Sequence, residues 1–237
     1  MSLNHSPSIV TDGLVLHLDA ASPKSYPRTG AIWYDRSINK TNGTLMNGVG
    51  YNSNNYGSLS FNGSNQYIVG DCSNISNNFT ISFYSYFNST PTNYPMLLQA
   101  RSSSGANSVN CISILFRPNG DTYGGSSGNR IMASVNGNVG NSVFPSIPFI
   151  SNEWAFYCTT YNNSQILFYK NAKLISTATP GSITPVGINQ LNIGINLGMP
   201  SDGYFNGNIS QASIYSRVLS PEEILKNFNA TRGRFVL

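Results

Sequence analysis

The stretch GYFNGNISQASIYSRVLSPEEILKNFNATRGRFVL, residues 203–237, says most about how this chain folds. The run NISQASIYS predicts a β-strand. Ser220, Pro221 and Glu223 then form a capping box with proline at the first helical position, which predicts where a helix begins. The segment therefore predicts a strand, a sharp stop and a short helix that closes a β-domain.

Short apolar runs upstream of this segment predict further β-strands. The clearest run spans residues 79–87, where four large apolar side chains share one face. They are Phe79, Ile81, Phe83 and Phe87. Burial of each such side chain is worth about 1.5–3 kcal/mol, so this face is expected to point into the core. The opposite face carries Tyr84 and Tyr86, and the sequence leaves open whether that face is covered or is a concave, partly wet surface.

Several other runs have the length and composition of strands. They are 13–19, 96–101, 111–116, 130–135, 153–161, 165–170 and 190–195. The runs 57–63 and 65–69 flank a Gly-Ser-Asn turn and predict a hairpin, and a second hairpin is expected to turn at Asn171 and Ala172. Residues 20–55 predict a long loop, in which Trp33 is the expected packing anchor and a ligand platform is the alternative.

Composition restricts the classes of function. Charged residues make up 9% of the 237 residues, so Asn, Ser, Thr and Gly must supply most of the polar surface, and these residues favour turns over helices. The net charge of +4 comes from scattered Lys and Arg, which argues against nucleic-acid binding. The sequence has neither a membrane-length apolar run nor a signal-peptide pattern, so we expect no membrane insertion and no Sec-type export.

The cysteines and acidic residues do not predict a metal site. Cys111 and Cys158 fall inside expected strands, where a buried free thiol is the expected state, and Cys72 makes the number odd. The sequence has no CxxC or HxxxH spacing for zinc. Calcium takes six to eight oxygen ligands, and the isolated Asp121 and Asp202 do not supply them. We therefore expect no cofactor, with calcium at Asp121 or Asp202 as the alternative.

Four motifs occur in an order that resembles laminin-G-like domains of the concanavalin A-like lectin/glucanase superfamily. They are WAFYCTTY from Trp154, FYKNAKL at 168–174, LNIG at 191–194 and FNGNISQASIYSRVLSPEEI at 205–224. The opening GLVLHLDAASPKSY, the motifs WYD and NGTL, and the ending FNATRGRF resemble versions found in structural proteins of bacteriophages and other viruses. The resemblance implies one all-β domain over 1–237, a jelly-roll β-sandwich of two antiparallel sheets with a short C-terminal helix.

Two positions depart from the pattern of these domains. Where they have Asn-Gly at a hairpin, this chain has Asn171 and Ala172, and alanine in a left-handed conformation costs about 1 kcal/mol, so the turn type is open. Where many of them carry Asp-Glu, this chain has Ser210 and Gln211. We therefore transfer to this chain no cation-binding or other role of that acidic pair.

The sequence lacks the residues that a hydrolytic enzyme needs. Glycoside hydrolysis uses two carboxyl groups about 5–9.5 Å apart, and the three glutamates do not form the E-x-D-x-x-E motif of the glucanase branch. A Ser or Cys nucleophile needs a base. His5 lies in the N-terminal segment, and His17 lies in the first expected strand on the face opposite the leucines. We therefore expect no enzyme.

Two loops carry residues suited to holding a sugar through aromatic faces, amides and carboxylates. The residues are Asp121, Tyr123 and Asn129 in the most glycine-rich loop, and Asp202 and Tyr204 before the last strand. Binding residues are often placed on loops at one edge of a sandwich, so these five residues form the expected ligand site. The alternative is that both are ordinary loops rich in Asn, Gly and Tyr.

The resemblance implies a non-enzymatic structural or surface-attachment component of a virus particle, with a phage as the expected source. Such a protein is made in the host cytoplasm and exposed on the particle surface. Its partners would be other virion proteins or copies of itself. The alternative is a carbohydrate-binding, lectin-like module whose partner is a cell-surface glycan, and a glycosidase ranks third.

Overall fold

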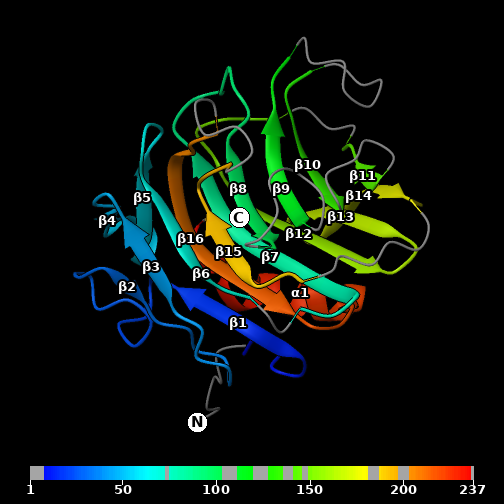
Figure 1. The fold of residues 1–237 in the computed structure, drawn as a ribbon, viewed down its shortest axis with the longest axis horizontal. Helices are drawn as coiled ribbons and strands as arrows, with labels where there is room; N and C mark the ends of the chain where they lie inside the picture. The colour runs from blue at the N-terminus through cyan, green and yellow to red at the C-terminus, as the bar shows by residue number, and fades with distance from the viewer. Residues whose placement is uncertain are drawn as a thin grey trace.

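Two β-sheets face each other in this protein, and one helix covers the outer side of one of them (Figure 1). The computed structural model describes residues 8–72, 75–102, 111–119, 128–135, 141–145, 149–180, 187–196 and 203–235. The strand pairs in both sheets are antiparallel. The predicted all-β sandwich with a short C-terminal helix is therefore confirmed.

Sheet A has the strand order β14-β13-β12-β7-β16-β5-β4, and β1 pairs with the second half of β16. Its strands are β1 (Leu14–Asp19), β4 (Gly50–Asn52), β5 (Ser58–Asn62), β7 (Asn78–Phe87), β12 (Trp154–Asn162), β13 (Ile166–Lys170), β14 (Lys173–Ala178) and β16 (Asn206–Tyr215). The strand predicted from the closing segment is β16. It lies inside the sheet, with β7 on one side and β5 and β1 on the other.

Sheet B has the order β11-β10-β9-β8-β15-β6-β3-β2. Its strands are β2 (Ile32–Trp33), β3 (Gly43–Met46), β6 (Tyr67–Asp71), β8 (Met96–Arg101), β9 (Cys111–Arg117), β10 (Arg130–Val135), β11 (Ser142–Val143) and β15 (Gln190–Ile193). Strand β15 comes late in the chain and pairs with β6 and β8, which come early. Its insertion makes the outer face of sheet B continuous from β3 to β11.

The inward faces of both sheets share one apolar core. The four apolar side chains of β7 predicted to point inward are all buried in it. Trp33 is 0% exposed and belongs to the same core, which confirms it as a packing anchor. The alternating side chains of the strands leave a second, outward face on each sheet.

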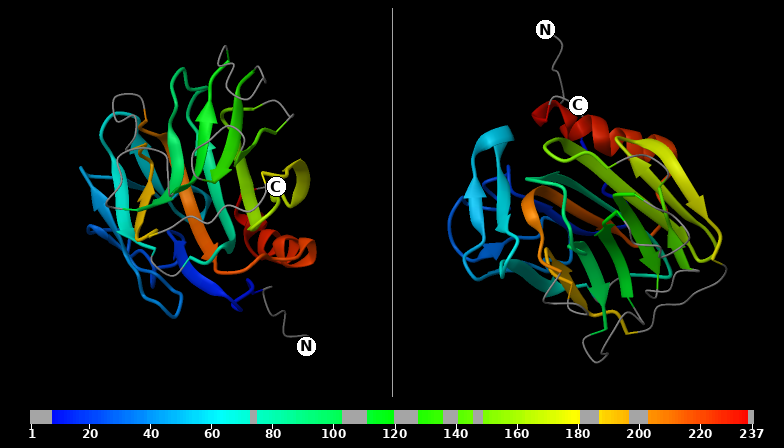
Figure 2. Two further views of the ribbon diagram at one scale, coloured as in Figure 1. Left: turned by 45° about the vertical axis from the view of Figure 1, so that its right-hand side comes forward. Right: turned by 90° about the horizontal axis from the view of Figure 1, so that it is seen from above.

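Helix α1 (Pro221–Thr231) lies on the outer face of sheet A, away from sheet B (Figure 2, right). It begins at the predicted capping box, in which the Ser220 side chain accepts from the Glu223 backbone N–H and the Glu223 carboxylate accepts from the Ser220 backbone N–H. The 3-10 turn Arg232–Arg234 follows. Phe235 then stacks on Tyr84 with ring centroids 4.5 Å apart, so the tyrosine face of β7 is covered at that residue.

Two predictions about the first third of the chain are wrong. Residues 57–63 and 65–69 do not form a hairpin, because β5 belongs to sheet A and β6 to sheet B. The turn between them is held by the Asn62 side chain, which accepts from the backbone of Ser64, and it carries the chain across from one sheet to the other. The predicted loop 20–55 contains the short strands β2, β3 and β4 as well as the 3-10 turn Asn54–Tyr56.

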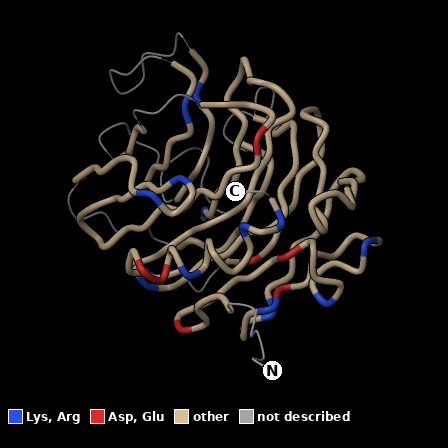
Figure 3. The backbone as a smooth tube through the Cα atoms, turned by 180° about the vertical axis from the view of Figure 1, so that it is seen from behind, with Lys and Arg blue, Asp and Glu red and all other residues tan. Residues whose placement is uncertain are grey.

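Lys and Arg are spread along the described chain, as predicted, and several form ion pairs (Figure 3). Arg234 holds Asp19 through two bonds of 2.8 and 3.0 Å, which ties the segment after α1 to β1. The cysteines are buried free thiols, as expected for Cys111 and Cys158. In the parts of the chain that the structure describes, no helix is long and apolar enough to span a membrane.

Candidate functional site

The outer face of sheet B carries a line of polar side chains across four neighbouring strands. Backbone pairing places Asn192 of β15 opposite Gln99 of β8, Gln99 opposite Ser113 of β9, and Ser113 opposite Ser134 of β10. Residues directly opposite each other in antiparallel strands point to the same face, with Cβ atoms about 5 Å apart. We call these four residues the polar row.

The polar row is buried and only partly hydrogen-bonded. Asn192 is 0% exposed, Ser134 2% and Gln99 5%. Both amide atoms of Asn192, Oε1 of Gln99 and Oγ of Ser134 have no hydrogen-bond partner within the protein. Leaving a buried polar group unpaired costs about 1–3 kcal/mol, and native proteins contain few such groups. Four of them in one line indicate a place where water or the hydroxyl groups of a bound molecule complete the hydrogen bonding.

The same face is more open over β6 and β3. Val69 lies opposite Asn192, and Thr44 lies opposite Val69, and both are only half-buried. Two residues along β6 from Val69, and therefore about 7 Å away on the same face, Tyr67 is also half-buried. Its ring lies 6.4 Å from that of Tyr204. The more exposed part of this face therefore carries two aromatic rings.

The opposite side of this face is apolar. Met96, Leu115 and Met132 form a small buried cluster on which Phe144 packs. The guanidinium of Arg130 lies over the Phe144 ring, 5.4 Å from its centroid. This arrangement closes the polar row over β9 and β10, and the open end of the face lies over β6 and β3, since Asn192 of β15 is itself 0% exposed.

The structure describes two of the five residues predicted to bind a ligand, and it does not bring them together. Tyr204 is half-buried beside Tyr67, at the open end of the face. Asn129 lies at the start of β10, where its side chain accepts from the backbone N–H of Asn119 at 2.8 Å. Strands β15, β8 and β9 separate β6 from β10. Asp121, Tyr123 and Asp202 lie outside the described residues.

The sequence prediction missed Gln99 and Asn192. Each is a single amide in an otherwise apolar strand, in MLLQA and QLNI. A polar residue at the outward position of such a strand was the available signal. Their alignment was not readable from the sequence, because it depends on the pairing of β8 with the distant β15.

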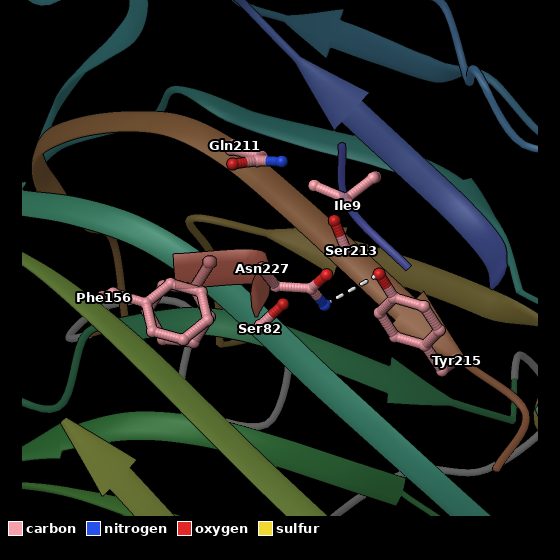
Figure 4. Close-up of a pocket in the computed structure, with 8 residues that line it drawn as sticks. Ile9, Ser82, Phe156, Gln211, Ser213, Tyr215 and Asn227 are labelled. Atoms are coloured by element: carbon pink, nitrogen blue, oxygen red, sulfur yellow. Dashed lines mark hydrogen bonds between the residues drawn. The ribbon is translucent and has the colours of Figure 1, made fainter. Parts of the chain in front are cut away.

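A second polar feature is a small hollow between α1 and the outer face of sheet A (Figure 4). It is lined by Ile9, Ser82, Phe83, Phe156, Gln211, Ser213, Tyr215 and Asn227. It has room for about one water molecule, which is far too little for a sugar. Asn227 crosses it, accepting from the Val10 backbone N–H and donating to the Tyr215 hydroxyl. The hollow therefore belongs to the packing of α1.

His17 and Ser213 form a hydrogen-bonded pair beside this hollow, with Nδ1 and Oγ 2.9 Å apart. The Asp35 carboxylate nearby accepts from the His17 backbone N–H and not from its ring. Burial lowers the pKa of His17, which disfavours the charged ring that a general base must become. Burial outweighs the opposing effect of the Asp19 and Asp35 carboxylates on this pKa, and we assign no catalytic role to the pair.

The acidic residues of the described chain are engaged in structural contacts. Glu153 pairs with Lys170 at 2.6 Å, and Glu223 pairs with Arg217 at 2.6 Å. Asp35 accepts from the backbone of Ser37 and Thr41 as well as from that of His17. Among the residues that the structure describes, no group of three or more His, Cys, Asp and Glu side chains could hold a metal ion.

Comparison with known protein families shows where this chain belongs. The model described as "Concanavalin A-like lectin/glucanases superfamily" matches residues 61–225, more than half of the chain. A comparison with curated proteins finds no match.

Solved structures with this fold include whole domains and parts of larger proteins. Domain 4 of AbnA, a GH43 extracellular arabinanase from Geobacillus stearothermophilus in complex with arabinotriose, is 14% identical, with a TM-score of 0.67 over 92% of this chain and 99% of that chain. Trypanosoma rangeli sialidase in complex with the inhibitor DANA is 17% identical, with a TM-score of 0.64 over 93% of this chain. The botulinum neurotoxin type G receptor binding domain is 17% identical, with a TM-score of 0.63 over 92% of this chain. The chain spans 33% of the sialidase and 51% of the neurotoxin domain.

Proposed function

We propose that this chain, which belongs to the concanavalin A-like lectin/glucanases superfamily, is a carbohydrate-binding module that uses the outer face of sheet B. The observation that carries the proposal is the polar row, whose buried amide and hydroxyl atoms lack partners beside two aromatic rings. The fold itself hosts many functions, so the function depends on the residues of this site. The names of the neighbouring arabinanase domain and neurotoxin receptor-binding domain are compatible with such a role.

In the proposed complex the apolar face of a sugar ring packs on Tyr67 and Tyr204, at the open end of the face. Its hydroxyl groups reach toward Asn192, where the amide offers a donor and an acceptor that nothing else in the protein uses. Gln99 adds a second acceptor next to Asn192. A polyol is the ligand class that can both donate to and accept from such a row.

The decisive experiment is a glycan array, with and without calcium, followed by titration of the best ligand. Arabinotriose is included in the array because the neighbouring arabinanase domain was solved with it. Stacking on an aromatic ring contributes about 0.5–1.5 kcal/mol, so the double variant Tyr67→Ala/Tyr204→Ala should bind about 10–100-fold more weakly. Tyr34→Ala is the matched control, because Tyr34 is 43% exposed and lies outside the site. A silent array, or equal binding by the double variant, would overturn the proposal.

We propose further that the module acts without catalysis. The support is the engagement of the described carboxylates in ion pairs and backbone contacts, since glycoside hydrolysis needs two free ones facing each other. Incubation of the best array ligand with the protein should release no reducing sugar over hours. Release that persists through repeated purification would show an enzyme.

A place on the surface of a virus particle is a second candidate function. The resemblance of both ends of the chain to phage proteins motivates it, and one structural observation favours it. Val10 bonds to Asn227 of α1, so the first and last described segments meet on the side of the molecule opposite the outer face of sheet B (Figure 2). If the protein is attached to a particle through either segment, the outer face of sheet B points away from the particle. The protein should then co-purify with particles, and its consistent absence from them would count against this role.

A further inference from the structure

We propose a second saccharide-binding surface on the outer face of sheet A, beside the part that α1 covers. Its centre is a row formed by Asn208 of β16, Tyr86 of β7 and Trp154 of β12, which the backbone pairing places side by side. The rings of Tyr86 and Trp154 lie 5.7 Å apart and are tilted by 49°. We call these three residues the aromatic platform. It goes beyond the function proposed above, because it lies on the other side of the sandwich.

The aromatic platform is open where the neighbouring part of sheet A is closed. Two residues further along β7 and β12, Tyr84 and Phe156 are 0% and 3% exposed beneath α1 and the segment that follows it. Tyr86 and Trp154 are only half-buried. The sequence thus places aromatic residues at consecutive outward positions of both strands, and the helix covers one pair and leaves the other half-buried.

Asn208 gives the platform an unused hydrogen-bond acceptor. Its side chain is 8% exposed, and its Oδ1 has no partner within the protein. A buried amide oxygen beside two accessible rings is the arrangement that holds a sugar hydroxyl while the ring stacks. The exposed amide of Asn152 lies 3.5 Å from the Tyr86 hydroxyl and adds a further polar group at the rim.

The Trp154 ring is fixed in place before any ligand arrives. Its Nε1 donates to Oδ1 of Asn55 at 3.2 Å, and Nδ2 of Asn55 donates in turn to the Arg234 carbonyl at 2.9 Å. Phe235 packs on the same indole with a centroid distance of 4.7 Å. A ring held from two sides loses little conformational entropy on binding. This small loss favours the binding of ligands that make weak contacts, such as sugars.

The charges near the platform define the class of ligand. Glu153 and Lys170 neutralise each other through a contact of 2.6 Å next to Trp154. The platform itself consists of a phenol, an indole and an amide, with no carboxylate, Lys or Arg side chain to match a charged sugar. The ligand is therefore an uncharged saccharide whose ring has one apolar face.

Trp154 allows this surface to be observed separately from the site on sheet B. The chain has two tryptophans, and the other, Trp33, is fully buried in the core. The experiment follows the two indole N–H resonances of the ¹⁵N-labelled protein during titration with lactose, maltotriose and arabinotriose, with 3′-sialyllactose as the charged comparison. We expect the Trp154 resonance to shift saturably with at least one neutral saccharide, more weakly with sialyllactose, and the Trp33 resonance to stay in place.

Variants then separate the two surfaces. Tyr86→Ala should weaken the affinity measured from the Trp154 resonance about tenfold. Tyr86→Phe, which keeps the ring, should retain that affinity. Tyr67→Ala/Tyr204→Ala should leave the Trp154 response unchanged even if it abolishes binding at sheet B. A Trp154 resonance that does not move with any of the three neutral saccharides overturns the inference. So does a Trp154 shift that disappears in the sheet B double variant, because that shift would come from the other site.

Discussion

Ser134→Ala tests whether the polar row contains unsatisfied hydrogen-bonding groups, because it removes one of them with almost no change in shape. The Ser134 hydroxyl is in a side chain 2% exposed and has no hydrogen-bond partner within the protein. An unpaired buried hydroxyl costs about 1–3 kcal/mol. The void left by the missing oxygen costs about 0.4 kcal/mol, from roughly 15 Å³ at about 24 cal/mol per Å³. The variant should therefore be more stable by about 1 kcal/mol.

The control for this measurement lies on the neighbouring strand. Ser113 is opposite Ser134 and is 4% exposed, but its hydroxyl is not among the buried atoms that lack a hydrogen-bond partner. Ser113→Ala should therefore lose about 1 kcal/mol. Urea unfolding of both variants at pH 7 measures the difference, provided that the slope with denaturant is unchanged.

One result would refute the reasoning about the row. If Ser134→Ala loses as much stability as Ser113→Ala, the Ser134 hydroxyl is already satisfied in the free protein. The polar row would then be an ordinary buried network, with no vacancy for a ligand to fill.

Two further predictions concern the elements that close the fold. Arg217 and the Ser220 backbone lower the pKa of Glu223 to about 2, so its contribution is complete above the unfolded value of 4.5 and is lost as the pH falls from 4.5 toward 2. Glu223→Gln should cost about 1 kcal/mol at pH 7 and flatten the loss of stability over that acid range, as urea unfolding at several pH values will show. Asn171 and Ala172 turn the hairpin with φ of 51° and 62°, so Ala172→Gly should relieve about 1 kcal/mol of strain and raise Tm by about 2–4 °C. A lower Tm would mean that the half-buried methyl of Ala172 contributes more than its backbone costs.

The local features of this fold were predictable from the sequence. The capping box fixes the start of α1, and the alternation in β7 identifies its core face, because both signals lie within a few residues of each other. The false hairpin of residues 57–63 with 65–69 shows the limit. A Gly-Ser-Asn turn says that the chain reverses, but the choice between pairing and crossing to the other sheet is made by β16 and β15, which lie over a hundred residues later.

The candidate site was less predictable for the same reason. Tyr204 could be named because an aromatic residue in a polar loop is visible in the sequence, and the structure places it beside Tyr67. The polar row depends on the pairing of β8 with β15 and with β9, so no local pattern contains it. The aromatic platform likewise depends on which pair of outward aromatics α1 covers, and that is decided by tertiary packing.

The three buried thiols can report which part of the folded structure opens first. Burial raises the pKa of Cys72, Cys111 and Cys158, in the case of Cys111 to about 11, so none of them reacts readily while its surroundings stay closed. Each sits in a different layer: Cys72 in the core between the sheets, Cys111 on the outer face of sheet B, and Cys158 beneath α1. A brief pulse of alkylating reagent, read out by mass spectrometry, therefore reports which layer separates first. A saccharide bound on sheet B should slow the modification of Cys111 and leave that of Cys158 unchanged.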